Sequence, residues 1–423
     1  MTGGPWALAA LLCWHLGVSG GLPKEVPAQQ VRPWTAGQRQ VRVLILEGAS
    51  PLSLCPQSSA VIENATGGAL ATIPAGVTVT AKPWNGQVSL RVGKRRFQAP
   101  RLVVRASSGG IVASSANGAA KRGLYPGALA IAATGSSLRV VNQVSLEDYL
   151  AGVVAAEVPR SFPVEAMRAQ AIAARTYTLS HLGDHAGQGA DLCAQVHCQV
   201  YAGLPPSGSR AAQAVRDTAG EVLVWNGLLI DALYHSACGG STAAAWDVRQ
   251  SKLLPYLTGA SDNDGFGSYY CGEDRDVHWI ARFTRQQAER LIAANLGTVL
   301  GRPGLATGRL KSLRVTARRG ARAEWLEIVT SKGSYRVRGD SIRWLFGSGS
   351  PGPAGLKSIA FTLSTETDRR GQPRAFVFQG AGHGHGIGLC QWGARGRAEN
   401  GQTAQEILAA YYPGAEIVDL RHG

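Results

Sequence analysis

The hydrophobic pattern of the chain changes its period at Ser145, and this change constrains the fold more than any other feature of the sequence. Between Val41 and Val141, short runs of alternating apolar and polar residues such as VRVLIL and VTVTAKPW are separated by Gly, Ser, Asn and Pro. Alternation with a period of two, interrupted by turn residues, is typical of β-strands. The pattern therefore predicts a β-rich N-terminal module.

After Ser145 the apolar residues recur with a helical period. SLEDYLAGVVAAEVP predicts a helix with Ser145 as its N-cap and Asp148 three residues later, in a capping-box arrangement. Pro159 ends this helix, because the residue before a proline is restricted to extended conformations. An alanine-rich second helix is predicted over residues 163–181, with Ser161 as its cap.

The remainder of the chain mixes strands and helices. Residues 221–236 and 310–345 resemble strands, and residues 284–296 resemble a helix. Thr403 followed by Glu406 predicts the start of a last helix, which Tyr412-Pro413-Gly414 ends. The order predicts an α+β fold, in which a β-rich module is followed by a mixed α+β catalytic domain with a helix-borne glutamate and strand-rich insertions.

The N-terminus and the net charge indicate where the protein acts. Trp6 to Val18 is an apolar run too short to span a bilayer but suited to a signal peptide, with cleavage expected after Gly20. The preceding MTGGP lacks Lys and Arg, so a buried terminal helix is the alternative. No later segment is long enough to span a membrane. The net charge of +15 suits nucleic acid, anionic lipid or an acidic cell wall.

Six cysteines remain after the apparent signal peptide: Cys55, Cys193, Cys198, Cys238, Cys271 and Cys390. In an exported protein an even number permits disulfides, and we favour a bridge between Cys238 and Cys271. Cys193 and Cys198 could form a second bridge. With His185, and with His197 close by, they could instead bind a structural zinc ion, to which Cys238 and Cys271 could add ligands. The sequence leaves these alternatives open, and no cofactor is required.

Glu157 is the first candidate for chemistry. It continues the apolar stripe of Leu146, Leu150, Val153 and Val154, eleven residues after the first of them. A carboxylate on the core-facing stripe, in the last helical turn, is disfavoured as an anion by both burial and the helix dipole. A carboxylic acid kept protonated in this way can act as a general acid. The alternative is that the last turn frays and Glu157 points into water.

Residues 382–388, with the sequence GHGHGIG, have glycine at every second position. If this segment is extended, the glycines form one bare face that permits the close approach of a ligand or of another backbone. His383 and His385 would then lie on the opposite face. A glycine-rich turn with incidental histidines is the alternative, and a metal pair is another.

Gln170 and Arg175 are polar residues in the alanine-rich second helix. At about 100° per residue they lie about 140° apart around the helix axis, so they do not face one cleft together. The alternative for Arg175 is an ion pair inside the domain, and the alternative for Gln170 is a solvated helix face.

Three ordered blocks resemble the stage II sporulation protein D and amidase enhancer family. They are VSLEDYLAGVVAAEVPRSFPVEAMRAQAIAARTYTL, YHSACGGSTAAAWDV and GHGHGIGLCQWGARGRAENGQTAQEILAAYYPG. The resemblance covers the chain from about Leu124 to Gly414, and the residues before it resemble the family's variable N-terminal part. The predicted domains are a signal peptide (1–20), a variable β-rich module (21–123) and a glycan-cleaving domain (124–423).

The resemblance implies a lytic transglycosylase that cuts peptidoglycan between N-acetylmuramic acid and N-acetylglucosamine, with a preference for peptide-stripped glycan. The family's E-x-P glutamate corresponds to Glu157, its A-A-R-T-Y arginine to Arg175, and the glutamine of the same helix to Gln170. Its H-G-x-G-x-x-Q-W-G motif corresponds to residues 385–393. The predicted substrate-binding residues are Gln170, Arg175, Ser236, His383, His385 and Gln391. A zinc-binding family member has one histidine and two cysteines near the catalytic helix, which His185, Cys193 and Cys198 approximate.

Two alternatives compete with this interpretation. One is a non-catalytic wall-binding module that enhances a cell-wall amidase. The other is a nucleic-acid-binding protein, for which the chain has the charge but neither a DNA-reading motif nor aromatic residues interleaved with basic ones. We expect peptidoglycan glycan strands as the partner, no nucleic acid, no membrane span after signal cleavage, and a location in the periplasm or cell wall.

Overall fold

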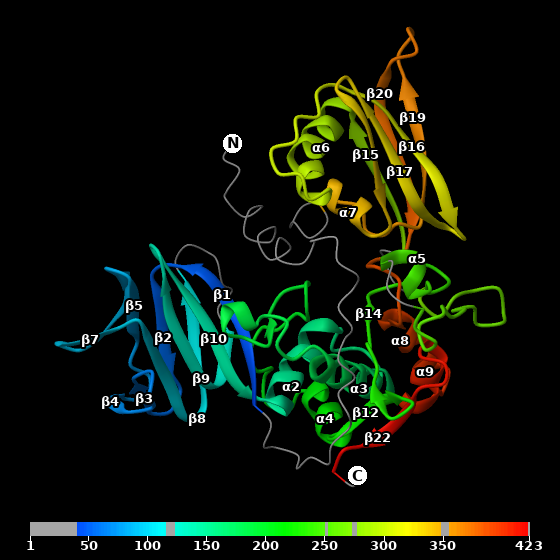
Figure 1. Ribbon diagram of the computed structural model, residues 1–423. Helices are drawn as coiled ribbons and strands as arrows, with labels where there is room; N and C mark the ends of the chain where they lie inside the picture. The colour runs from blue at the N-terminus through cyan, green and yellow to red at the C-terminus, as the bar shows by residue number, and fades with distance from the viewer. Residues whose placement is uncertain (1–39, 116–122, 250–252, 273–276, 348–354, 422–423) are drawn as a thin grey trace. The chain divides into compact units, whose positions relative to one another are not determined.

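The computed structural model describes residues 40–115, 123–249, 253–272, 277–347 and 355–421 (Figure 1). The chain divides into two compact units. The first runs to Asp231 and includes the C-terminal strand from Glu416, and the second spans Ala232–Ala415. Strands and helices are mixed in both units, which confirms the predicted α+β class. The predicted signal peptide lies outside the described residues.

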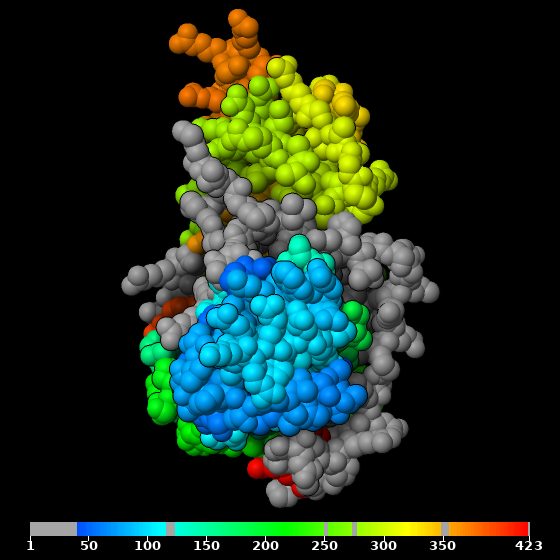
Figure 2. Space-filling model, turned by 90° about the vertical axis from the view of Figure 1, so that its left-hand side faces the viewer, coloured from blue at the N-terminus to red at the C-terminus, as the bar shows by residue number. Residues whose placement is uncertain are grey.

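One large sheet dominates the first unit. Its strands are β1 (Gln40–Ala49), β2 (Leu52–Pro56), β3 (Ala60–Glu63), β4 (Ala69–Ile73), β5 (Val79–Trp84), β6 (Gln87–Val92), β7 (Arg95–Ala99), β8 (Arg101–Ser115), β9 (Gly123–Thr134), β10 (Ser137–Ser145) and β11 (Leu192–Cys193). The strand order is β11-β1-β10-β9-β8-β2-β5-β6-β7, with β3 on β8 and β4 on β3. The strands that precede α2 in the chain, coloured blue to cyan, form a continuous surface in Figure 2.

The sheet follows from the alternation in the sequence. Val41 and Val43 of β1 are fully buried, whereas Gln40 and Arg42 between and beside them are exposed. β8 pairs with β9 in antiparallel register, with Val103 opposite Ala130. The domain boundary that the sequence suggested after residue 123 therefore falls between neighbouring strands of one sheet, and that boundary stays a prediction.

The remaining elements of the first unit are α2 (Leu146–Glu157), α3 (Val164–Ser180), the 3-10 helix η1 (Ala186–Gln188), α4 (Arg210–Asp217), β12 (Glu221–Trp225), β13 (Leu228–Leu229) and β22 (Glu416–Asp419). The Ser145 side chain caps α2 by accepting a hydrogen bond from the Asp148 N–H, as predicted. Helix α3 begins after Pro163, which makes no side-chain cap bond. The prediction of Ser161 as the cap was wrong, because a turn from Pro159 to Phe162 precedes the helix.

The second unit contains three small sheets and five helices. Its elements are β14 (Tyr234–His235), α5 (Ala245–Arg249), β15 (His278–Thr284), α6 (Arg285–Val299), β16 (Leu310–Arg319), β17 (Arg322–Thr330), β18 (Gly333–Arg338), α7 (Ser341–Leu345), β19 (Phe361–Thr367), β20 (Pro373–Ala381), β21 (Leu389–Cys390), α8 (Gln391–Glu399) and α9 (Ala404–Tyr411), all within the described residues. The sheets are β14-β21, β15-β20-β19 and β16-β17-β18.

The capping-box residues of the sequence correctly predicted where two helices of the second unit begin. Capping boxes begin α6 at Thr284 and α9 at Thr403, which confirms both predicted helix starts. The last five residues of the stretch 310–345, which the sequence pattern predicted as strand, form helix α7 instead. Among the residues that the structure describes, no helix has both the length and the apolar character needed to cross a membrane.

Candidate active site and metal-binding loop

Glu157 is the last residue of α2. The helix ends there because Pro159 restricts Val158, which adopts an extended conformation (φ −123°, ψ 144°). The Glu157 side chain is half-buried, and its Oε1 accepts a hydrogen bond from the Val200 N–H at 2.7 Å. The backbone of a loop that follows α3 in the chain therefore holds the carboxylate at the end of α2.

The loop residues next to Val200 are bonded to both helices. The Gln199 amide donates hydrogen bonds to Thr178 Oγ1 at 2.8 Å and to the Tyr149 hydroxyl at 3.2 Å. Burial raises the pKa of Tyr149 well above its ordinary value, so this hydroxyl stays protonated. The Tyr201 hydroxyl donates to the buried Asn142 side chain at 2.9 Å. The loop is thus fixed on α2, on α3 and on strand β10.

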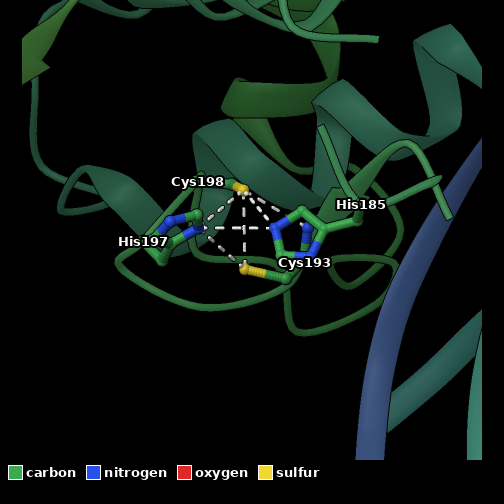
Figure 3. Close-up of side chains that lie close together, drawn as sticks. All are labelled: His185, Cys193, His197 and Cys198. Carbon is green, nitrogen blue, oxygen red and sulfur yellow. Dashed lines mark hydrogen bonds between the residues drawn. The ribbon is translucent and has the colours of Figure 1, made fainter. Parts of the chain in front are cut away.

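The same loop begins at a cluster of two histidines and two cysteines (Figure 3). His185 precedes η1, Cys193 ends β11, and His197 and Cys198 follow in the loop. The Cys193 and Cys198 sulfurs are 3.5 Å apart, and the His185 and His197 nitrogens are 3.4 Å apart. The Cys198 sulfur lies 3.3 Å from His185 Nε2 and 3.4 Å from His197 Nδ1.

These distances fit a tetrahedral zinc site. With Zn–S bonds of about 2.3 Å and Zn–N bonds of about 2.0–2.1 Å, the edges of the tetrahedron would be about 3.8 Å between sulfurs, about 3.3 Å between nitrogens and about 3.6 Å between unlike atoms. Hydrogen bonding to Cys198 lowers the pKa of the Cys193 thiol, so the cluster already favours a thiolate. His185, Cys193 and Cys198 were predicted as ligands. His197, which the sequence showed to be close by, lies in the same cluster as a possible fourth ligand.

Arg175 lies fully buried in α3, and its guanidinium is satisfied within the first unit. It makes a bidentate ion pair with Glu147, at 3.0 Å and 2.7 Å. It also donates to the backbone carbonyls of Glu221 and Val215, both at 3.1 Å. These contacts correspond to the alternative of an ion pair inside the domain. We therefore assign Arg175 a structural role in place of the predicted contact with substrate.

Gln170 is 1% exposed, so the alternative of a solvated helix face was wrong. Neither its amide oxygen nor its amide nitrogen has a hydrogen-bond partner among the described residues. An unsatisfied buried amide is costly. The other buried polar side chains of the helix, such as Arg175 and Thr176, do have hydrogen-bond partners.

The glycine-rich segment 382–388 belongs to the second unit and is not extended, because Gly382, Gly384, Gly386 and Gly388 all have positive φ angles. A Cβ on Gly388 would lie 2.0 Å from the Leu233 carbonyl oxygen, and one on Gly384 would lie 2.8 Å from His235 Cβ. The expectation of an extended, bare glycine face was therefore wrong. These glycines permit left-handed turns and close packing on the neighbouring segment of the same unit.

His385 is bonded to the backbone through both ring nitrogens. Nε2 lies 2.8 Å from the Tyr234 carbonyl oxygen, and Nδ1 lies 3.1 Å from the Ile387 backbone nitrogen. Because a carbonyl only accepts, the proton is on Nε2, and Nδ1 accepts from the Ile387 N–H. The predicted binding of sugar hydroxyls by these nitrogens would require the loss of one of these bonds.

The second unit contains three other predicted substrate-binding residues. His383 and Gln391 are close to His385 in sequence, and Ser236 is next to Ala237, which pairs with His383. His383 pairs with Ala237 in an antiparallel bridge. The carbonyl of Ser236 accepts a hydrogen bond from Trp392 N–H, next to Gln391 at the start of α8. The structure thus groups the predicted residues in two sets. Glu157, Gln170 and Arg175 lie in the first unit, and Ser236, His383, His385 and Gln391 lie in the second.

The six described cysteines are free thiols in the structure. Cys238 and Cys271, the pair favoured for a disulfide, have sulfurs 3.6 Å apart, whereas a disulfide bond is about 2.05 Å long. The structure therefore contains neither of the predicted bridges among the residues that it describes.

The helix that ends in a carboxylate and the Cys/His loop lie in a region that matches a known protein family. The model of the stage II sporulation protein family matches residues 134–225, which include α2, α3, the loop with the Cys/His cluster and α4. A model for a domain of unknown function matches residues 245–388. The protein is therefore a cell-wall-related protein of the stage II sporulation type.

Curated relatives support the same assignment. An uncharacterized protein of Brachyspira hyodysenteriae is 28% identical over 73% of this chain and 77% of its own length. The amidase enhancer of Bacillus subtilis is 29% identical over 63% of this chain and 40% of its own length. The stage II sporulation protein D of Bacillus subtilis is 26% identical over 66% of this chain and 75% of its own length. These similarities agree with the resemblance of the sequence to the stage II sporulation protein D and amidase enhancer family.

Proposed function

We propose that the protein is a lytic transglycosylase that cleaves peptidoglycan between N-acetylmuramic acid and N-acetylglucosamine, in glycan whose stem peptides have been removed. The observation that carries the proposal is the placement of Glu157. It is a half-buried carboxylate at the end of α2, held by the Val200 N–H at 2.7 Å. A fixed, partly desolvated carboxyl group is suited to general acid–base catalysis.

A single carboxyl group is sufficient for this reaction. A glycoside hydrolase normally uses two carboxyl groups, one as the general acid and the other as a base or nucleophile. In the proposed reaction, protonated Glu157 gives its proton to the glycosidic oxygen as the bond from C1 of the muramic acid breaks. The Glu157 carboxylate then takes the proton from the C6 hydroxyl of the same sugar, whose oxygen bonds to C1. The products are a free N-acetylglucosamine hydroxyl and a 1,6-anhydro ring, and Glu157 is protonated again.

The cluster of His185, Cys193, His197 and Cys198 would hold a zinc ion in the loop that contacts this carboxylate. When bound, the ion supplies a rigid link between the segment before η1 and the loop. Cys198 is two residues from Val200, whose N–H orients Glu157. In this proposal the loop has a positioning role, and Glu157 alone transfers protons.

The test is the digestion of peptide-stripped glycan by wild-type protein and by Glu157→Gln, with the products analysed by mass spectrometry. Wild type should release fragments with 1,6-anhydro ends. Glu157→Gln should bind glycan and lose about 10²–10⁴-fold in rate, the usual contribution of a general acid. Glu165→Gln is a matched control, because Glu165 pairs with Arg168 in the first turn of α3 and should retain the wild-type rate. Retention of more than about a tenth of the rate in Glu157→Gln would contradict the proposal.

The second candidate function is a non-catalytic enhancer of a cell-wall amidase. The similarity to a protein named amidase enhancer favours it, as does the bonding of Arg175 and His385 to the protein itself. In that case wild type would bind glycan without releasing anhydro ends, and Glu157→Gln would stimulate a purified amidase as well as wild type does.

We also propose that the protein is exported and acts in the periplasm or cell wall. The net charge of +15 suits an anionic wall polymer, to which a basic protein is attracted over long distances. Detection of a mature N-terminus at Gly21 in the exported fraction would support the predicted signal peptide.

A further inference from the structure

A second cluster of thiols lies in the unit that spans Ala232–Ala415. Cys238, Asp262, Cys271 and Cys390 are all buried, and their sulfur and carboxylate atoms all lie within 4.8 Å of one another. The Cys238 sulfur is 3.6 Å from the Cys271 sulfur and 3.3 Å from Asp262 Oδ2. Cys238 and Cys390 are 152 residues apart in sequence, so only the fold brings the four together.

We propose that Cys238, Asp262, Cys271 and Cys390 bind a second zinc ion, as a closed structural site. A tetrahedral site with Zn–S bonds of about 2.3 Å and Zn–O bonds of about 2.0–2.2 Å has edges of about 3.8 Å between sulfurs and about 3.6 Å between sulfur and oxygen. The measured separations are close to these values. Three soft thiolates with one carboxylate favour zinc over magnesium or calcium, which prefer oxygen ligands.

Backbone N–H groups are directed at the sulfurs of this cluster. The Cys390 sulfur accepts from the Cys238 N–H at 3.2 Å and from the Gly393 N–H at 3.3 Å. The N–H groups of Gly239 and Gly240 hydrogen-bond to Cys271. Hydrogen bonds of this kind stabilise thiolates and fix the orientation of metal ligands.

Asp262 is oriented in the same way. Its Oδ1 accepts a hydrogen bond from the Tyr411 hydroxyl at 2.5 Å and lies 3.5 Å from Arg397 Nε. Its other oxygen, Oδ2, is the one that faces Cys238. Tyr411 and Arg397 thus hold one oxygen and present the other to the cluster.

The charges also balance with a divalent ion. Three thiolates and one carboxylate carry four negative charges, of which a zinc ion neutralises two. Arg397 lies beside Asp262, and the buried Arg322 interacts electrostatically with Cys238 and Cys390. These two guanidinium groups offset the remaining two negative charges, which avoids an uncompensated buried charge.

A disulfide between Cys238 and Cys271 explains the cluster less well. It would use two of the three sulfurs and leave the Cys390 thiol and the Asp262 carboxylate buried beside it. It would also give no reason for the backbone N–H groups that point at Cys390. A metal ion uses all four side chains.

The test is the zinc content of the full-length protein, measured by inductively coupled plasma mass spectrometry. Wild type should contain about two zinc ions per chain, because each ligand cluster holds one. Cys390→Ser and the double variant Cys193→Ser/Cys198→Ser should each lose about half of the zinc. Cys55→Ser is the matched control, since Cys55 lies in β2 outside both clusters, and it should keep the wild-type content.

A wild-type zinc content in Cys390→Ser would overturn the proposal, as would a Cys238–Cys271 disulfide in the peptide map of unreduced wild-type protein. If Cys390→Ser fails to fold, the double variant loaded with cobalt gives the answer. Thiolate-to-cobalt charge-transfer absorption must then come from the second site, and its absence would refute the site. Metal content is independent of glycan cleavage, so Glu157→Gln should retain both ions whatever its activity.

Discussion

At the scale of single residues, the buried amide of Gln170 makes the sharpest prediction. Gln170→Met keeps the side-chain length and removes two unsatisfied polar atoms, so we expect the variant to gain about 1–3 kcal/mol in the free energy of unfolding. Urea denaturation measures this gain. A loss of stability would mean that an ordered water molecule satisfies the amide. If Gln170 is retained for glycan binding, the stabilised variant should also cleave more slowly.

The sequence identified single candidate residues but could not predict which residues they contact. Glu157 was identifiable because the apolar stripe and Pro159 are local signals. The bidentate partner of Arg175 is Glu147, 28 residues earlier, and no periodicity links the two. For the same reason the tautomer of His385, which depends on the Tyr234 carbonyl 151 residues away, could not be predicted.

At the scale of elements, the contact between α2 and the loop after the Cys/His cluster supports a prediction about Gly152. An alanine inside a helix is normally favourable by about 1 kcal/mol over glycine. Here the added Cβ would lie 2.4 Å from the Gly203 carbonyl oxygen and 2.5 Å from the Tyr201 ring. We therefore expect Gly152→Ala to lower the melting temperature and to reduce glycan cleavage, because it displaces the loop that holds Glu157.

Gly187→Ala is the matched control for Gly152→Ala. Gly187 lies in η1, and a Cβ there would meet nothing within 4 Å. The control should melt and cleave like wild type. Equal effects of the two substitutions would show that the loop is not held against α2 as described.

Treatment with a chelator tests the same loop at the end that carries the Cys/His cluster. Chelation should increase amide hydrogen exchange in the loop from Cys193 to Tyr201 and reduce glycan cleavage, because the Val200 N–H would no longer hold Glu157 in place. Strands β5 to β7, which lie elsewhere in the large sheet, should exchange as before. Unchanged exchange in the loop would contradict the positioning role of the cluster.

At the scale of the whole molecule, the sequence predicted those strands and helices that depend on short-range patterns. The strands before Ser145 and the capped helices α2, α6 and α9 depend on alternation and on residues three positions apart, so they were accessible. The thiol cluster of Cys238, Asp262, Cys271 and Cys390 was not accessible, because its members are far apart in sequence and only the fold brings them together. The glycine segment was misjudged for the same reason, since its packing surface is formed by a distant segment.

The stability of the folded protein should depend on pH through His235. Burial, together with a smaller contribution from the nearby Arg322, lowers the pKa of His235 to about 3, although Nδ1 donates a hydrogen bond to the Ile387 carbonyl. In the unfolded chain a histidine has a pKa of about 6.5, so between these values the unfolded state binds a proton that the folded state does not. Stability is therefore fully present above about pH 6.5 and decreases as the pH falls towards 3.

His235→Asn retains a donor for the Ile387 carbonyl and cannot be protonated. Urea denaturation at pH 7 and pH 4 should show a smaller loss of stability for this variant than for wild type, and equal losses would exclude His235 as the cause.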